Sequence, residues 1–370
     1  MGRVLAVALA AACLGAFLPL AASGAESREA ELFAKSGAAG MYDSLDGETR
    51  ELLSQAGVEE AQVEGELEAE SLLGAVARLV REKVTAPLKA LAALVGVIVL
   101  SRLAACWEER RLGKTAALAG ALACAGIVAG PLAELIDQVG TVAETASAFL
   151  LASVPVYGGL LVAAGSGVTG GSYSFLTLAA GNAIPLVVSG LVLPLLCLFL
   201  ALALVSAVSE TGLDRLGKSL YGFAKWALVL VVTVFSGFLS LQTALNAQVD
   251  AAANKAAKLA MSSAVPIVGS AFGDAVAAIQ NSVQVVKSGV GAFGILASLC
   301  LFAPAAVQAG LWVAVCTLGQ VAGDLFQTPR VAAFLGACAG VARMLLAVLA
   351  SICAVSVVSA AVVLFVRGSL

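Results

Sequence analysis

The stretch that decides the fold covers residues 145–209 and reads TASAFLLASVPVYGGLLVAAGSGVTGGSYSFLTLAAGNAIPLVVSGLVLPLLCLFLALALVSAVS. None of these 65 residues is charged. A helix that spans a membrane needs about 20 consecutive apolar residues, so the stretch is too long for two straight spans. We expect the glycine-rich run at 165–171, together with Pro185 and Pro194, to divide it into about three segments.

The composition of the whole chain also indicates a membrane protein. The 370 residues are 61% hydrophobic and 12% charged, whereas soluble domains carry roughly 25% charged residues. So few charges cannot cover a water-soluble protein of this size, which excludes an ordinary soluble enzyme. The absence of histidine excludes Ser-His hydrolysis, histidine-ligated metals and histidine proton relays. Neither half has a stripe of Lys and Arg, so nucleic acid is not an expected partner.

The remaining apolar segments predict an all-α, polytopic helical membrane protein with about seven to nine membrane segments. The further spans are expected at 86–106, at 115–136, at 226–245, in two short pieces of 288–323 around Pro304, and at 344–366. Lys and Arg gather in 107–114, in 210–225 and at Arg367, so we expect these parts and the C-terminus to be cytoplasmic. The acidic loop expected at 137–144 would face the other side.

The first 25 residues have the pattern of a secretory signal peptide. Arg3 precedes an apolar run, and small residues precede Glu26, so we expect cleavage after Ala25. The alternative is an uncleaved anchor helix. Either way, the lipid bilayer is the expected surroundings of most of the chain.

Residues 26–85 are expected to form a small helical extracytoplasmic head. The segment 26–83 holds 14 Asp and Glu but only 6 Lys and Arg. Its Leu and Val residues recur at helical intervals between Gly47, Gly57 and Gly65, which predicts two or three short amphipathic helices. So few large apolar groups make an independent domain doubtful. We therefore expect the head to pack on a partner or to remain a flexible, solvated segment.

Residues 246–288 predict an amphipathic helical hairpin between the first group of membrane helices (86–245) and a C-terminal group (289–370). The polar residues of its arms are Asp250, Asn254 and Lys258, then Asp274, Asn281 and Lys287, with Pro266 and Gly269 at the break. In one interpretation the hairpin re-enters the membrane or lines a water-filled passage. In the other it lies on the bilayer surface.

Arg343 allows two interpretations of its own. If a helix begins near Val331, Arg343 lies well inside it, which is costly unless the charge is paired or hydrated. If the span is 344–366, Arg343 caps its extracytoplasmic end.

No catalytic, cofactor-binding or metal site is predicted. The chain has no P-loop, and Ala271-Phe272-Gly273-Asp274 lacks the first glycine of the motif used by intramembrane aspartyl proteases. The seven cysteines beyond the signal peptide form no CxxC pair and are interpreted as small packing residues. We therefore expect a protein that is not an enzyme.

The order of signal peptide, acidic head and polytopic body resembles the stage III sporulation protein AE family of endospore-forming bacteria. The resemblance is most specific in SSAVPIVGSAFGDAVAAIQNSVQVVKSGVGAFG (262–294). It is supported by FLLASVPVYGGLLVAAGS (149–166), GNAIPLVVSGLVLPL (181–195) and WALVLVVTVFSGFLSLQ (226–242). The chain is richer in alanine and glycine than is typical of the family.

This resemblance implies a non-enzymatic subunit of a mother-cell complex that acts as a secretion or feeding channel for the forespore. The complex lies in the mother-cell membrane around the forespore and meets a forespore partner across the intermembrane space. Its ATPase is a separate subunit. Two alternatives remain open: a stand-alone secondary transporter of a small solute, and an assembly scaffold without a passage. A homo-oligomer is also compatible with the sequence.

Overall fold

The structure is a computed structural model that describes residues 37–55, 58–59, 62–63, 69–106, 110–164, 166–208, 215–235, 237 and 269–365. It describes the backbone alone for 58–59, 62–63, 69–73, 75–76, 105–106, 110–114, 116–117, 208, 269–285, 287–288 and 365. The expected signal peptide and the first arm of the expected hairpin lie outside the described residues.

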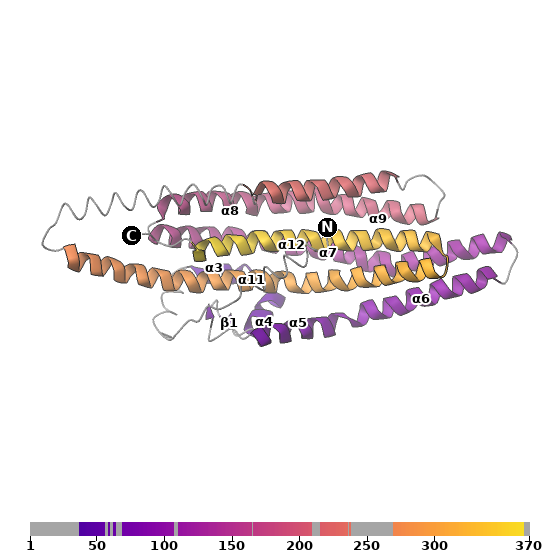
Figure 1. Cartoon of the computed structure of the whole chain (residues 1–370), viewed down its shortest axis with the longest axis horizontal. Helices are drawn as coiled ribbons and strands as arrows, with labels where there is room; N and C mark the ends of the chain where they lie inside the picture. The colour runs from indigo at the N-terminus through magenta and orange to yellow at the C-terminus, as the bar shows by residue number, and fades with distance from the viewer. Residues whose placement is uncertain are drawn as a thin grey trace.

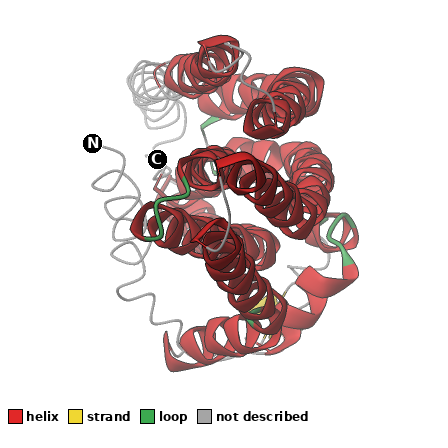
Figure 2. Cartoon of the chain, turned by 90° about the vertical axis from the view of Figure 1, so that its right-hand side faces the viewer, coloured by secondary structure: helices red, strands yellow, loops and turns green. Residues whose placement is uncertain are grey.

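The described elements are almost entirely helical, apart from one short antiparallel strand pair. The head contains α3 (Ala38–Asp43), α4 (Gly47–Gln55), β1 (Val58–Glu59), β2 (Gln62–Val63) and α5 (Ala69–Lys83). The body contains α6 (Thr85–Cys106), α7 (Arg110–Ala163), α8 (Gly167–Val187), the π-helix η1 (Val188–Val192), α9 (Leu193–Val208), helix Arg215–Phe235, α11 (Gly269–Leu325) and α12 (Pro329–Phe365). These body helices run along the long axis of the molecule (Figure 1) and are seen end-on in Figure 2.

Six helices in the described part of the chain are long and apolar enough to cross a membrane. They confirm the all-α membrane class, but they are fewer than the seven to nine expected segments. The difference arises because 115–163 and 288–325 are each part of one continuous helix. The expected loop at 137–144 lies inside α7, and Pro304 lies inside α11 without ending it. In an apolar bundle, neighbouring helices can satisfy the backbone groups that a proline frees.

The charge-free stretch 145–209 is interrupted once in the structure, at the glycine-rich run. Helix α7 ends at Ala163 and α8 begins at Gly167. At the expected break near Pro185 and Pro194, the chain instead forms the five-residue π-helix. The Val188 N–H reaches the carbonyls of both Ile184 and Pro185, so the helix widens locally rather than ending.

Helices α11 and α12 form the most extensive contact in the bundle, as an antiparallel pair. Their turn is short because Gln327 adopts a left-handed conformation (φ 54°) and the Thr328 N–H donates to the Gly323 carbonyl at 2.8 Å. In the most apolar part of α11, 67% of the residues are buried, compared with 17% in helix Arg215–Phe235. Helix α11 therefore lies at the centre of the bundle and helix Arg215–Phe235 at its edge.

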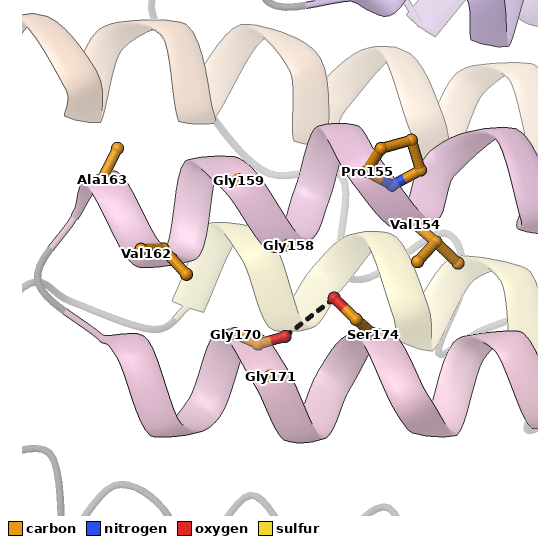
Figure 3. A pocket seen from close by; sticks show the side chains of 9 residues that line it. All are labelled: Val154, Pro155, Gly158, Gly159, Val162, Ala163, Gly170, Gly171 and Ser174. Atoms are coloured by element: carbon orange, nitrogen blue, oxygen red, sulfur yellow. Dashed lines mark hydrogen bonds between the residues drawn. The ribbon is translucent and has the colours of Figure 1, made fainter.

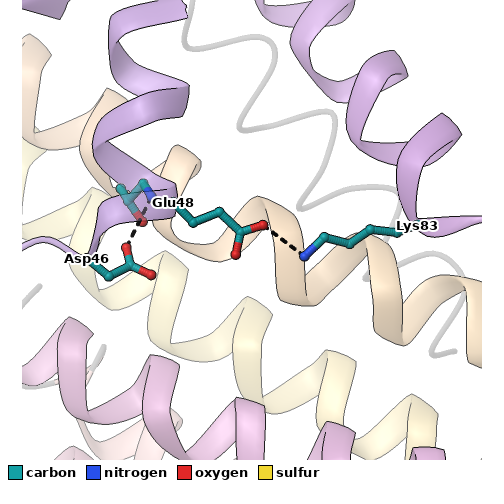
Figure 4. Close-up of polar contacts among 4 residues, drawn as sticks. Asp46, Glu48 and Lys83 are labelled. Carbon is teal, nitrogen blue, oxygen red and sulfur yellow. Dashed lines mark hydrogen bonds and ion pairs between the residues drawn. The ribbon is translucent and has the colours of Figure 1, made fainter.

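The head packs on the bundle. Leu53 and Met41 are completely buried in one apolar cluster with Tyr157 of α7 and Phe293 of α11. Figure 4 shows how α4 is held at its start. The Thr49 N–H donates to Asp46 Oδ1 at 3.2 Å, and Lys83 Nζ of α5 lies 2.8 Å from Glu48 Oε1. The surface that the short head helices need is thus supplied by the chain's own helices.

The two ends of the bundle differ. Helices α6, α9 and α11 end at the right-hand end in Figure 1, where α7 and α12 begin. Arg102 Nη2 donates to Gln327 Oε1 at 3.2 Å and so joins the end of α6 to the turn between α11 and α12. The last turns of α12 lie at the opposite end, where Ala360 and Val363 belong to the same apolar cluster as the head.

The number of candidate spans bears on the expected topology. If each of the six helices crosses the membrane once, the head and the end of α12 at Phe365 lie on the same side. An extracytoplasmic head and a cytoplasmic C-terminus are then incompatible. The sequence expectation placed them on opposite sides because it counted an odd number of crossings.

The docking of the head can be tested with Leu53→Ala. Removing a buried leucine side chain costs about 2–5 kcal/mol, so the head should detach more readily from α7 and α11. Limited proteolysis of the purified protein should show faster cleavage within residues 37–83, with the bundle helices still resistant. Glu51→Ala, at an exposed position of the same helix, is the control. Equal cleavage of the two variants would contradict the docked head.

Candidate functional site

The residues expected to line a passage are only partly described. Asp250, Asn254, Lys258, Pro266 and the cleavage residue Ala25 lie outside the described residues. Gly269 is the first described residue of α11, and the expected break before it lies outside the described residues. Asp274, Asn281 and Lys287 lie in the helical backbone that follows, and their side chains are outside the description. The second arm of the expected hairpin is therefore continuous with the membrane helix after it.

Arg343 lies in the middle of α12, which begins at Pro329. The helix therefore begins where the interpretation of Arg343 as a residue inside a longer helix requires, and Arg343 is not at a helix end. Its side chain is exposed, and Nη2 donates to Thr317 Oγ1 of α11 at 3.0 Å. The charge is thus hydrogen-bonded to a neutral hydroxyl.

A cluster of buried hydroxyl groups lies where α7, α8 and α12 meet. Tyr157 of α7 and Tyr173 of α8 are 1% and 3% exposed, and their rings meet edge to face with centroids 6.1 Å apart. The Tyr173 hydroxyl faces the hydroxyls of Ser153, Thr177 and Ser359. We call these five residues the hydroxyl cluster.

Three atoms of the hydroxyl cluster lack a hydrogen bond within the described residues. They are Tyr157 Oη, Tyr173 Oη and Ser359 Oγ. An unsatisfied buried hydroxyl costs about 1–3 kcal/mol, and proteins commonly satisfy such groups with ordered water. The cluster is thus a polar region inside an otherwise apolar bundle.

Glycines position the helices around the hydroxyl cluster. A Cβ at Gly294 of α11 would lie only 1.7 Å from Tyr157 Oη and 3.1 Å from the Cβ of Ala360. Any side chain there requires the Tyr157 side chain or one of the neighbouring helices to move. The Ser298 hydroxyl donates to the Gly294 carbonyl at 2.7 Å, and the Ser147 hydroxyl donates to the Gly181 carbonyl.

A hollow of about 440 Å³ opens between the end of α7 and the start of α8 (Figure 3). Its lining residues are Val154, Pro155, Gly158, Gly159, Val162, Ala163, Gly170, Gly171 and Ser174. Ser174 supplies the one side-chain hydroxyl of this lining, and it donates to the Gly170 carbonyl at 2.9 Å. Because most of the lining residues are small, another helix or a ligand could come close to the backbone there. The lining supplies no reactive side chain.

The described side chains include groups that pack and form hydrogen bonds, but they do not form a recognisable metal site or catalytic group. Within the described ranges, no three His, Cys, Asp or Glu residues gather as metal ligands. The six cysteines whose side chains the structure describes are free thiols. The hydroxyl cluster contains neither a base nor a carboxylate to activate a nucleophile.

The sequence analysis missed the hydroxyl cluster. A signal was available: two of the four tyrosines of the chain lie inside the charge-free stretch 145–209. Polar side chains inside a membrane bundle generally face its interior, which would have predicted a buried pair. That Ser359, about 200 residues away in the sequence, joins them depends on tertiary packing that no spacing rule reveals.

The tight approach of α11 to α7 can be tested with Gly294→Ala. The added methyl group should collide with Tyr157 Oη and destabilise the protein by about 1–3 kcal/mol. Tyr157→Phe removes the colliding atom, so the double variant should recover most of this loss. The thermal unfolding midpoint in detergent is the measurement. Gly159→Ala, where a Cβ meets nothing within 4 Å, is the control. A Gly294→Ala variant as stable as this control would contradict the packing.

Comparisons with known proteins agree with the expected family. The family model for stage III sporulation protein AE (spore_III_AE) matches residues 54–367, which include the head from the end of α4 onward and all of the body helices. The chain is 28% identical over 166 residues to stage III sporulation protein AE of Bacillus subtilis (strain 168), a match that covers 45% of the chain. It covers 42% of that relative, and so less than half of its length. No solved structure matches. Because the family match extends over most of the sequence, the chain belongs to the stage III sporulation protein AE family.

Proposed function

We propose that the chain is a non-enzymatic membrane subunit of the stage III complex that links the mother cell to the forespore. In this proposal it lies in the mother-cell membrane around the forespore and works with other stage III subunits, including a separate ATPase. It is needed for late forespore development. The observation that carries the proposal is the family match over residues 54–367.

The length of the helices supports a subunit that reaches beyond the bilayer. Helices α7 and α11 have 54 and 57 residues, which is about 80 Å or more at 1.5 Å per residue. The apolar core of a bilayer is about 30 Å thick. The bundle is therefore long enough to project well out of the membrane, as contact with partners across an intermembrane space requires.

The interior supports assembly rather than ion-coupled transport. A secondary transporter needs an intramembrane charge or coordination site for its coupling ion. The buried polar residues of the described part are Ser and Thr, with the tyrosines of the hydroxyl cluster beside them. The hydroxyl cluster can hold water, but it offers no charge to couple to an ion gradient.

The charges at the ends of the bundle support an orientation. Arg102, Arg215, Lys218 and Arg330 lie near the end where α6 and α11 finish. By the preference of Lys and Arg for the cytoplasm, this end faces the mother-cell cytoplasm. The head and the end of α12 then face the intermembrane space.

Purification from sporulating cells tests the proposed function. A tagged copy should recover other stage III proteins, and deletion of the chain should arrest spores after engulfment. Capture without any stage III protein, or normal sporulation after deletion, would contradict the proposal. Movement of a defined solute into liposomes by the purified chain alone would favour a stand-alone transporter instead.

The orientation has its own test. A C-terminal fusion to a phosphatase that is active only outside the cytoplasm should be active, because the end of α12 lies at the same end as the head. A fusion made after residue 212, between α9 and helix Arg215–Phe235, is the matched control and should be inactive. The reverse pattern would overturn the orientation.

A further inference from the structure

Arg343 carries a charge for which the described chain supplies no counter-ion. Its guanidinium has five N–H donors, and the hydrogen bond given for it goes to the neutral Thr317 hydroxyl at 3.0 Å. The nearby Tyr221 hydroxyl donates to the Gly340 carbonyl and supplies no negative charge. The side chain is exposed within a helix of membrane-spanning composition. An unpaired charge in such a helix is costly, so a partner outside the described chain is expected.

Helix α7 carries the opposite charge on its own exposed face. Glu134, Asp137 and Glu144 are spaced by three and seven residues, which places them on one side of the helix. All three are exposed, and none has an ion pair with a described residue. They also lie within a candidate membrane span, Leu118–Ala163. We call this set the acidic stripe.

Arg343 and the acidic stripe lie at the same height along the bundle. Gly294 sits against both Tyr157 of α7 and Ala360 of α12, so these two residues are level with each other. Helices α7 and α12 run in the same direction (Figure 1). Arg343 precedes Ala360 by 17 residues, and residue 140 precedes Tyr157 by the same number. Arg343 therefore lies at about the height of the part of α7 that carries Asp137 and Glu144.

The two charged surfaces are exposed on two helices of the same bundle and are not joined by an ion pair within the described chain. Helices α7 and α12 pack against each other. The residues next to Arg343 in the sequence are buried, as are those next to the acidic stripe at Leu135 and Ile136. Each helix thus buries the side that faces the bundle and exposes the side that faces away. Within the described chain, Arg343 therefore has no ion pair with the acidic stripe, and both remain open to a second molecule.

We propose that Arg343 of one copy docks on the acidic stripe of a second copy of this chain. A rotation about the bundle axis, with little shift along it, brings the two surfaces together. The interface is heterologous, because different surfaces of the two copies meet. When further copies add in the same way, they form either a closed ring or an open filament. Charge complementarity at equal height identifies a second copy, rather than an unrelated protein, as the occupant.

The neighbours of the charged residues allow this contact. Ala347 and Ala350 are exposed beside Arg343, and Ala133 and Ala148 are exposed beside the acidic stripe. Small side chains let membrane helices approach closely. A close approach would also exclude water from the ion pair, and the lower dielectric constant would strengthen it.

Charge exchange tests the interface. Two differently tagged copies of the full chain are co-expressed and solubilised in a mild detergent, and one tag is used for capture. Arg343→Glu and Asp137→Arg should each lower the recovery of the second copy by about tenfold. The chain that carries both substitutions should recover association, because the two exchanged charges again attract each other across the interface. Lys218→Glu, at an exposed position of helix Arg215–Phe235, should leave recovery unchanged.

The other occupants give different results. If Arg343 binds a lipid phosphate, Arg343→Glu leaves the capture of the second copy unchanged, which overturns the proposal. If the partner is another protein, the double variant fails to restore association, which also overturns it.

A second experiment avoids the charge changes altogether, in case those variants fail to fold. Thr141→Cys on one tagged copy and Ala347→Cys on the other should give a disulfide-linked dimer on mild oxidation. Wild-type chains, with their native cysteines, provide the background. No dimer above this background would overturn the proposal. Neither experiment depends on the stage III complex, so the interface can fail while the proposed function stands.

Discussion

The structure depends on how closely the long apolar helices approach α11. In a bilayer, the lipid is as apolar as the side chains, so helices associate through close packing and interhelical polar contacts rather than through hydrophobic burial. Gly291, Gly294, Gly319 and Gly323 remove the side chains that would hold α11 away from α7 and α12. The head packs on the same helix through Val286, Val290 and Phe293. Helix α11 thus connects the membrane bundle to the head.

The distribution of polar groups follows from the same arrangement. Hydroxyl groups can be buried inside the bundle because each can form a hydrogen bond to a nearby carbonyl or to water. Charged side chains cannot be accommodated there without a partner, so they lie on exposed faces, as Arg343 and the acidic stripe do. A single chain with such surfaces is suited to contact with further copies or other subunits, which agrees with the proposed role in an assembly.

The membrane class could be predicted from the sequence, because a charge-free run of 65 residues allows few folds. The family could be predicted because segments such as 262–294 resemble its members. The positions at which the apolar helices break were harder to predict. Proline and acidic residues signal a loop in a soluble protein, but Pro304, Asp137 and Glu144 lie inside continuous helices. The glycine-rich run at 165–171 did mark a real turn. The outcome at each point depends on whether neighbouring helices support the backbone, which a single sequence does not show.

The site was less predictable than the fold. The hydroxyl cluster joins Tyr157, Tyr173 and Ser359 through contacts between distant parts of the chain. The docking of the head likewise needs α7 and α11 to be in place first. By contrast, Arg343 could be singled out from the sequence, because a charge inside an apolar run is visible without the fold.

Cryo-electron microscopy of the chain purified with its partners from sporulating cells tests the central claim most directly. The account predicts unbroken α7 and α11 more than twice as long as the bilayer core is thick, with the head on their side and with other subunits around the bundle. A solitary chain whose helices break at 137–144 and at Pro304, with the head detached, would contradict it.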